Sequence, residues 1–225
     1  MDNGLSLSVR DLTVAGDRGR SILSLDRLVL EPGVALGVQG PSGAGKSTLI
    51  FALAGLAASA TGSVRWGETD LLSLSARRTA AFRARNIGLI FQDFLLFDEL
   101  GAEDNASVQS LFAPRGRRPG LREQAGAMLD RLKVPKASRT VASYSGGERQ
   151  RVSVARALAH EPAIVLADEP TASLHRAAAD ALTDDLLADV RARGRTLIVA
   201  SHDERLLSRM DRRLHLADGT VREAA

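Results

Sequence analysis

The chain of 225 residues contains no cysteine. This absence excludes a disulfide framework and a thiolate metal site, and it is typical of proteins in a reducing compartment. Aromatic residues make up only 4% of the sequence, so few rings are available to stack on nucleic-acid bases. We therefore expect no nucleic-acid partner.

Long apolar runs are also missing. The longest, from Leu49 to Ala60, is too short to span a bilayer. The segment from Met1 to Arg10 lacks the charged region and apolar core of a secretory signal, so we expect none. The expected location is the cytoplasm, and any work at a membrane then requires a partner that holds the chain there.

Charge of one sign is not concentrated in long runs. The net charge is +3, but basic and acidic residues alternate along the chain, which is typical of a solvated mixed surface. One basic cluster, Arg115 to Arg118, lies in a loop and is suited to contact with a phosphate or a lipid headgroup. Lysine occurs only at Lys46, Lys133 and Lys136, so an ammonium retained at Lys46 in an arginine-rich chain is informative.

What the sequence does contain is a glycine-rich loop with the spacing G-x-x-x-x-G-K-[ST]. In such loops the glycines let consecutive N–H groups point at phosphate oxygens, the lysine reaches the outer phosphates and the hydroxyl binds Mg²⁺. The pattern predicts binding of a nucleoside triphosphate. The predicted phosphate-binding residues are Gly40, Pro41, Ser42, Gly43, Ala44, Gly45, Lys46, Ser47 and Thr48.

The flanking patterns predict an α/β fold with a mostly parallel sheet. A strand from Val34 to Val38 precedes the loop and an apolar helix from Leu49 to Ala58 follows it. Continuous apolar runs predict buried parallel strands. They are Ile87 to Phe91, Ile164 to Ala167 and Thr196 to Ala200. Alternating patterns predict an N-terminal antiparallel β-subdomain. They are Leu5 to Thr13, Leu25 to Leu30 and Gly62 to Trp66.

The middle of the chain has a helical character. An amphipathic pattern predicts a helix from Leu121 to Leu132, and a second helix is expected from Arg149 to His160. No repeat or long linker divides the sequence. We therefore expect one domain over residues 1–225, with a helical subdomain inserted at about residues 94–160.

A second candidate element is the strand that ends in Asp168 and Glu169. An α/β sheet binds its ligands at the carboxyl ends of its strands, so both carboxylates are expected near the phosphates. Asp168 is suited to Mg²⁺, and Glu169 is suited to orient or deprotonate the attacking water. Without the glycine-rich loop, the same pair is more often a simple strand end.

A third candidate element is Ser145, Gly146, Gly147 and Glu148 at the predicted start of a helix. A helix N-terminus with bare glycines forms an anion site. Since the chain already has one phosphate loop, this second site is expected to face the nucleotide of another copy. The alternative is an ordinary serine N-cap.

Together these elements resemble the ATP-binding cassette (ABC) ATPases over nearly the whole chain. The resemblance implies ATP and Mg²⁺ as ligands, and a head-to-tail homodimer in which Ser145 to Glu148 contact the partner's ATP. It implies that Gln92 senses Mg²⁺ and water, that His202 contacts the γ-phosphate, and that Ser47, Gln92 and Asp168 hold the metal. Glu169, His202 and Gln92 are then the catalytic residues.

Within that family the motifs are similar to the subgroup that powers lipoprotein release and macrolide or peptide export. Such cassettes work with separate integral membrane permease subunits, on the inner face of the cell membrane. The segment Asp93 to Asn105 is where the permease is expected to dock, through Phe94, Leu95, Leu96 and Phe97. Two alternatives remain open: an accessory ATPase of a soluble phosphonate carbon-phosphorus lyase complex, and a regulatory cassette of cell-wall remodelling. Cargo and transport direction stay open.

Three positions depart from the family pattern. His175 stands where an aspartate is usual, Tyr144 replaces a leucine, and the segment Val14 to Gly16 lacks the aromatic residue that usually stacks on adenine. The missing ring puts base affinity or selectivity in question, because one stacking contact contributes on the order of 1–3 kcal/mol. We nevertheless predict an active ATPase.

Overall fold

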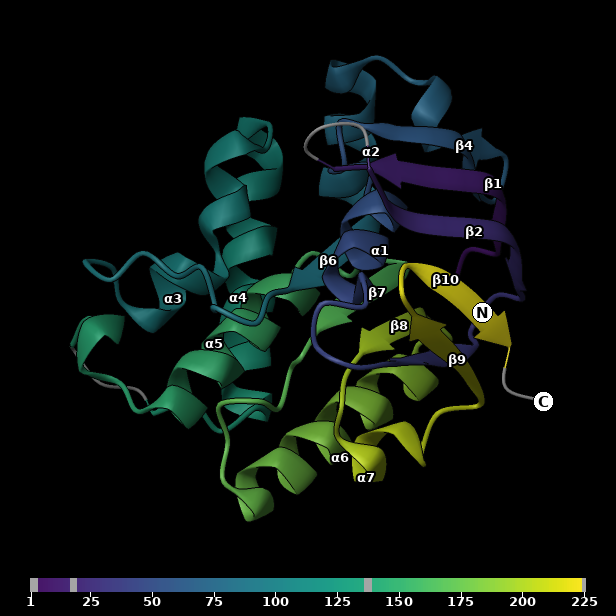
Figure 1. Cartoon of the computed structure of the whole chain (residues 1–225). Coiled ribbons are helices and arrows are strands. Elements are labelled where there is room, and N and C mark those ends of the chain that lie inside the picture. The colour runs from purple at the N-terminus through teal and green to yellow at the C-terminus, as the bar shows by residue number, and fades with distance from the viewer. Residues whose placement is uncertain (1–3, 17–19, 136–138, 224–225) are drawn as a thin grey trace.

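A computed structural model describes residues 4–16, 20–135 and 139–223. Its strands form a single sheet in the order β5-β4-β1-β2-β10-β9-β3-β8-β7-β6. Figure 1 shows this sheet running through the molecule, with α3, α4 and α5 on one side. The first three and last two residues of the predicted domain, and Lys136, lie outside the described residues.

The N-terminal antiparallel strands are present as predicted. β1 (Leu7–Ala15) pairs with β2 (Ser21–Leu30) and with β4 (Ala60–Trp66), and β4 pairs with the short β5 (Thr69–Asp70). Buried residues recur at alternate or near-alternate positions, because successive side chains of a strand point to opposite faces. These strands do not form a separate sheet, since β10 (Thr220–Glu223) joins β2 to the rest.

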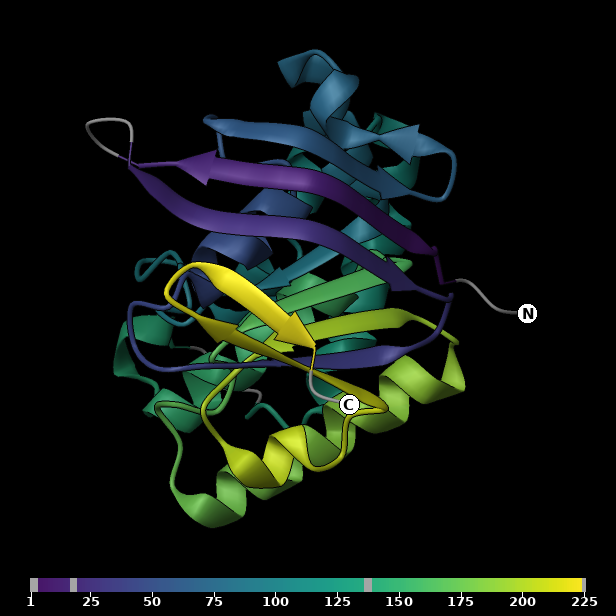
Figure 2. The same cartoon turned by 45° about the vertical axis from the view of Figure 1, so that its right-hand side comes forward.

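The remaining strands are parallel, which confirms the predicted core. They are β9 (Arg212–Ala217), β3 (Ala35–Gln39), β8 (Thr196–Ala200), β7 (Ile164–Asp168) and β6 (Ile87–Ile90). Every residue of β7 and β8 is buried, as expected for strands covered on both faces. Figure 2 shows the N-terminal strands and the C-terminal hairpin of β9 and β10 in one twisted sheet.

Two hydrophobic clusters lie on opposite faces of the parallel strands. Leu166 and Ile198 belong to the cluster with α1 and the N-terminal strands. Their neighbours Val165 and Leu197 belong to the cluster with the helices α5 and α6. Because successive side chains of a strand point to opposite faces, the same strands contribute to both cores. Packing on both faces holds the strand ends in place.

Helix α1 (Lys46–Leu53) follows β3 and begins three residues earlier than predicted. Gly45 precedes it in a left-handed conformation (φ 95°), so the loop runs straight into the helix. Trp66 donates from its indole N–H to the carbonyl of Leu53 at 2.9 Å, which satisfies an acceptor at the helix end.

The sequence analysis missed helices α2 (Ala76–Asn86) and α6 (Arg176–Ala192) and the short α7 (Glu204–Leu207). In α2 only Thr79 is buried, so an apolar period is absent. In α6 the buried Ala179, Leu182 and Leu186 recur at helical spacing, and this signal was available in the sequence.

Three α-helices lie between β6 and β7 in the residues that the structure describes. They are α3 (Ala102–Ala106), α4 (Arg118–Arg131) and α5 (Gly146–Leu158), with the 3₁₀ turn η3 (Val108–Phe112) after α3. Both predicted helices exist, and each starts three residues earlier than expected. Pro119 lies in the first turn of α4, where its missing N–H costs no hydrogen bond.

Candidate nucleotide-binding site

The glycine-rich loop connects β3 to α1 at the carboxyl end of the parallel strands. Gly43 has a φ of 77°, a left-handed conformation in which glycine is favoured. A Cβ at Gly40 would lie 2.2 Å from the carbonyl oxygen of Leu216, so only glycine fits there. The backbone itself therefore requires the glycines.

Lys46 is buried and its ammonium lies inside the curve of this loop. Its Nζ donates to the carbonyl oxygens of Gly40 at 2.9 Å and Pro41 at 3.1 Å. The same atom lies 3.9 Å from Oε1 of Glu169. A positive charge is thus held at the centre of the loop and close to a carboxylate.

Asp168 ends β7 and is almost fully buried. Burial raises the pKa of this carboxyl group, while a hydrogen bond with Ser47 favours the ionised form. Its Oδ1 is buried and has no hydrogen-bond partner among the described residues. A buried carboxylate oxygen beside a hydroxyl is the donor set that Mg²⁺ prefers, so the residues present fit this ion.

Glu169 and His202 meet as the strand order predicts, because β7 and β8 are neighbours. The Nδ1 atom of His202 lies 2.9 Å from Oε2 of Glu169. Ser201 donates its hydroxyl to the same oxygen at 3.1 Å. Glu169 has a φ of 46°, and its N–H donates to Ala200 at 2.8 Å. Ser201 and His202 therefore hold the carboxylate, while Ala200 holds the strained backbone of the same residue.

These groups line one pocket of about 570 Å³. Gln92, after β6, also lines it. Of the nine predicted loop residues, only Ala44 is absent from the lining, because its side chain is buried in the core below the loop. The sequence analysis did not anticipate Ile22 of β2 and Ala172, which complete the wall.

The signature residues Ser145 to Glu148 lie elsewhere. Among the described residues that line the nucleotide pocket, none belongs to this segment. Ser145 caps α5 through a reciprocal capping box, in which its N–H donates to Glu148 Oε2 at 2.7 Å. That hydrogen bond is the main reason why the pKa of Glu148 is lowered. Ser145 and Gly146 are exposed to solvent.

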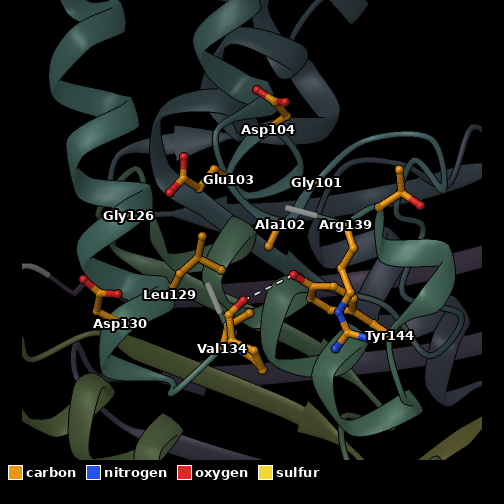
Figure 3. Close-up of a pocket in the computed structure, with 12 residues that line it drawn as sticks. Gly101, Ala102, Glu103, Asp104, Gly126, Leu129, Asp130, Val134, Arg139 and Tyr144 are labelled. Atoms are coloured by element: carbon orange, nitrogen blue, oxygen red, sulfur yellow. Dashed lines mark hydrogen bonds between the residues drawn. The ribbon is translucent and has the colours of Figure 1, made fainter. Parts of the chain in front are cut away.

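Arg139 supports this helix start and was not anticipated from the sequence. Its guanidinium lies 4.4 Å from the ring centre of Tyr144 and 2.8 Å from Glu148 Oε1. Tyr144 is buried, as expected for a residue that plugs the helix start, and its hydroxyl donates to Pro135 at 3.3 Å. Figure 3 shows both side chains beside a second pocket, formed with α3 and α4.

That second pocket has a volume of about 590 Å³, slightly more than the first. Its lining includes the carboxylates of Glu103, Asp104 and Asp130 but no residue of the glycine-rich loop. Size alone therefore does not identify the nucleotide site, whereas the converging loop, lysine and carboxylates do.

His175 begins α6 and acts as its N-cap. Its Nδ1 accepts a hydrogen bond from the N–H of Ala178 at 3.4 Å. The next residue, Arg176, forms an ion pair with Asp203 at 3.0 Å. Asp203 directly follows His202 in the sequence. Partial burial opposes ionisation of Asp203, but the hydrogen bond and charge of Arg176 together with the backbone N–H groups of Arg205 and Leu206 lower its pKa. The two loops are thus tied together within one chain.

Comparison with known proteins agrees with this geometry. Residues 24–172 match the family described as ABC transporter. The chain is 37% identical over 194 residues to the lipoprotein-releasing system ATP-binding protein LolD of Porphyromonas gingivalis, covering 86% of this chain and 89% of that protein. It is 38% identical over 195 residues to the macrolide export ATP-binding/permease protein MacB of Rhodopseudomonas palustris, of which it covers only 30%.

The fold is similar to that of a solved cassette. A dimeric, post-hydrolysis structure of the ATP-binding cassette MJ0796, bound to ADP and Pi, superposes with a TM-score of 0.87 and 28% sequence identity, covering 97% of each chain. No helix in the described part of this chain has the length and hydropathy needed to cross a bilayer. A glycine-rich phosphate loop, a carboxylate pair at the end of a strand and the matches above lead to one conclusion: the chain belongs to the ABC transporter family, as an ATPase cassette.

Proposed function

We propose that residues 1–225 form a single ABC ATPase domain, with a helical subdomain at about residues 94–160, that binds and hydrolyses ATP to drive a separate membrane permease. The observation that carries this proposal is the convergence of Lys46, Asp168, Glu169 and His202 in one pocket. These residues come from segments far apart in the sequence, and only the parallel sheet unites them.

In the proposed site the loop from Gly40 to Thr48 binds the phosphates. Its N–H groups and the N-terminus of α1 favour negative charge, and Lys46 exchanges its carbonyl acceptors for phosphate oxygens. Ser47, Asp168 and Gln92 would hold Mg²⁺, which neutralises charge on the outer phosphates when bound. The partnerless Oδ1 of Asp168 supports this assignment.

Glu169 is assigned to the attacking water. One of its oxygens accepts hydrogen bonds from the Ser201 hydroxyl and the His202 loop, which aligns the carboxylate. His202 is assigned to the γ-phosphate. Its Nδ1 faces Glu169, which leaves Nε2 as the ring nitrogen that can reach a phosphate oxygen.

Completion of the site is assigned to a second copy of the chain. Ser145 and Gly146 are exposed at the start of α5, outside the pocket of their own chain. In a head-to-tail dimer they contact the partner's ATP, which gives two nucleotides between two chains. The dimeric arrangement of the similar cassette MJ0796 supports this assignment.

Permease docking is assigned to an apolar surface after Gln92. Of the four residues predicted for this contact, Leu95 is 56% exposed and Phe97 is 52% exposed, whereas Leu96 packs against the core and Phe94 is partly buried. Phe112, in η3, is 88% exposed. Phe112 also lines a surface pocket with Gln109 and Leu121.

The cargo class rests on the relatives. One is named for lipoprotein release and another for macrolide export. The macrolide protein carries a permease in the same chain as its cassette. We therefore propose export or extraction of a lipoprotein, peptide or amphipathic molecule, with this chain at the inner face of the membrane beside a separate permease.

Sedimentation of the Glu169→Gln variant tests the shared site. With ATP and Mg²⁺ the variant is expected to form a stable dimer. Addition of Ser145→Arg should abolish that dimer and leave ATP binding to single chains intact. A dimer that survives Ser145→Arg would contradict the assignment of the signature.

Purification from native membranes tests the transport assignment. The chain is expected to bring down an integral membrane protein, and Phe112→Glu with Leu95→Glu should release it while basal ATPase activity persists. Val29→Glu, an exposed position on β2, is the matched control. Recovery with a soluble multi-subunit enzyme instead would favour an accessory ATPase, and a cell-wall hydrolase in the complex would favour a regulatory cassette.

A further inference from the structure

Two segments of the chain carry arginines but no carboxylate, and neither belongs to the nucleotide site. Residues 71–91 contain four arginines and no aspartate or glutamate. Residues 105–122 also contain four arginines and no aspartate or glutamate. The net charge of the chain is only +3, so the rest of the sequence carries more carboxylates than basic groups. Positive charge is therefore concentrated in segments that ATP hydrolysis does not use.

The fold brings the two segments together. Arg85 of α2 lines a pocket of about 370 Å³ with Phe112 of η3 and with Arg117, which ends the 3₁₀ turn η4 (Arg115–Arg117). Leu121 of α4 lies in the same lining, and no carboxylate of the described residues does. The arginines of both segments therefore surround an apolar centre.

These arginines have no partner of opposite charge within the described chain. Arg85, Arg115 and Arg117, which we call the basic surface, are exposed. No ion pair among the described residues includes any of them. By contrast, the exposed Arg139 pairs with Glu148 at 2.8 Å. The field of the basic surface is thus available to an anion from outside the chain.

Apolar side chains beside the basic surface project into solvent. Phe112 is 88% exposed and Leu111 is 56% exposed. Arg118 donates to the carbonyl oxygens of Leu111 at 3.3 Å and Ala113 at 3.0 Å, which holds the turn that presents them. An exposed ring and an exposed aliphatic side chain next to arginines are the residue types that attach proteins to the interface of an anionic bilayer.

We propose that the basic surface binds the negatively charged headgroups of membrane lipids and holds the chain against the bilayer. Its charges come from separate elements and form a broad positive field, which suits a surface of many headgroups better than a single phosphate. Phe112 was assigned above to the permease, so the arginines around it face the same membrane. For this orientation the inference rests on the proposed function, and it adds lipid as a second membrane contact.

Vesicle flotation of the purified full chain, without permease or nucleotide, tests this proposal. The chain is expected to bind vesicles of phosphatidylcholine mixed with phosphatidylglycerol, and not vesicles of phosphatidylcholine alone. Binding should be lost in about 1 M salt, where the Debye length falls to about 3 Å. Equal binding to both kinds of vesicle, or to neither, would overturn the proposal. Displacement by inorganic phosphate but not by chloride of equal ionic strength would show a site for a free anion and would also overturn it.

A triple variant localises the contact. Arg85→Gln, Arg115→Gln and Arg117→Gln together should lower partitioning into the mixed vesicles on the order of 100-fold, because each arginine near an anionic surface contributes about fivefold. Basal ATPase activity should not change, since none of the three lines the nucleotide pocket. Arg115→Glu, a single exposed change, should weaken binding by more than about fivefold and keeps the test valid if the triple variant folds poorly.

The matched control replaces three other exposed arginines, Arg10, Arg27 and Arg65 of the N-terminal strands, by glutamine. It changes the net charge by the same amount and should bind the mixed vesicles like the wild type. Equal losses in both triple variants would show that net charge and not the basic surface drives binding, which contradicts the proposal.

The vesicles contain no protein, so this test is separate from the test of the proposed function. A wild-type chain that binds mixed vesicles but recovers no membrane protein would retain the lipid contact and lose the permease assignment. A chain that binds no vesicles, while its triple variant at the basic surface fails to recover the membrane protein, would show that the surface contacts an acidic protein segment. The lipid proposal would then be wrong.

Discussion

The nucleotide pocket and the signature end of α5 both place a helix N-terminus where a phosphate can bind, but their polar groups are in opposite states. In the pocket, Lys46 lies against backbone carbonyls and Asp168 keeps a buried oxygen without a partner among the described residues. At the signature end, Ser145 is fully engaged with Glu148, which Arg139 holds in place. The nucleotide pocket therefore presents polar groups suited to a ligand, whereas the polar groups at the signature end already bond to one another.

This difference indicates how binding energy is divided between the two surfaces. Nucleotide and Mg²⁺ would supply partners of opposite charge to the buried Lys46 and Asp168. They are therefore expected to bind in the pocket first. The signature end must exchange a carboxylate acceptor for a phosphate oxygen, and that exchange yields little net energy. Dimer formation should therefore be weak without bound nucleotide and should depend on ATP. Four predictions follow from this contrast, in order of decreasing effect.

The largest effect is expected inside the pocket. Glu169→Gln keeps the size of the side chain but removes the group that accepts a proton, so turnover should fall by about 10²- to 10⁴-fold. ATP binding should remain within a few-fold of wild type. Single-turnover hydrolysis together with equilibrium binding separates these two effects. Asp184→Asn, an exposed change on α6, should leave both values unchanged. Wild-type turnover in Glu169→Gln would show that another group activates the water.

The next effect concerns the end of α5 opposite to the signature. His160 follows α5, its ring nitrogens are buried, and burial lowers its pKa to about 4 from 6.5. The unfolded chain therefore takes up a proton between pH 6.5 and pH 4 that the folded chain does not. Stability should be complete above pH 6.5 and should fall by about 3 kcal/mol as the pH drops to 4.

Urea unfolding at pH 7 and pH 4.5 measures this loss. His160→Gln removes the titrating group, so its loss of stability over the same interval should be smaller than that of the wild type. His215→Gln serves as the matched control, because His215 is an exposed histidine on β9. Equal pH dependence in wild type and His160→Gln would rule out His160 as the source.

A smaller effect is expected at the signature end. Arg139→Gln removes a contact with Tyr144 and an ion pair with Glu148, each worth about 0.5–1 kcal/mol at a partly exposed site. Dimer affinity in the Glu169→Gln background should fall about fivefold, whereas ATP binding to single chains should not change. Arg10→Gln on β1 is the control. A loss of single-chain ATP binding would show that the two surfaces are not separable.

The smallest effect is expected at the start of α6. Aspartate is a better N-cap than histidine, and its charge is favourable at a helix N-terminus. His175→Asp should therefore stabilise the chain by about 0.5–1 kcal/mol, seen as a higher melting temperature. His175→Ala, which removes the acceptor for Ala178, should lower it. If both variants melt at the wild-type temperature, the imidazole does not cap the helix.

Much of the core could be predicted because the sequence patterns that specify its strands and its loop each span only a few neighbouring residues. The apolar runs of β7 and β8 and the glycine spacing before α1 specify strand, loop and helix within short windows. Helix α2 could not be found in the same way, because Arg83 and its neighbours present a polar surface and Arg83 donates to the carbonyl of Gly55 at the end of α1. Its place depends on a partner helix and not on its own pattern.

The residues of the candidate site also fall into a group that local sequence patterns predicted and a group that they did not. Lys46, Asp168 and Glu169 were predictable, since each belongs to a motif whose residues are adjacent in the sequence. Ile22 and Arg139 were not, because neither belongs to such a motif. Ile22 reaches the pocket through strand pairing, and Arg139 reaches the signature end through contacts with Tyr144 and Glu148.

The sequence by itself determined the family, the phosphate loop and the strands that end in carboxylates, because the backbone conformation of a glycine loop and the burial of an apolar run depend on neighbouring residues. Only the tertiary structure decided which side chains share the pocket, that Ile22 lines it, and that Ser145 lies outside it. These are distances between segments far apart in the chain, and they exist only after β2, β3, β7 and β8 have been assembled into one sheet.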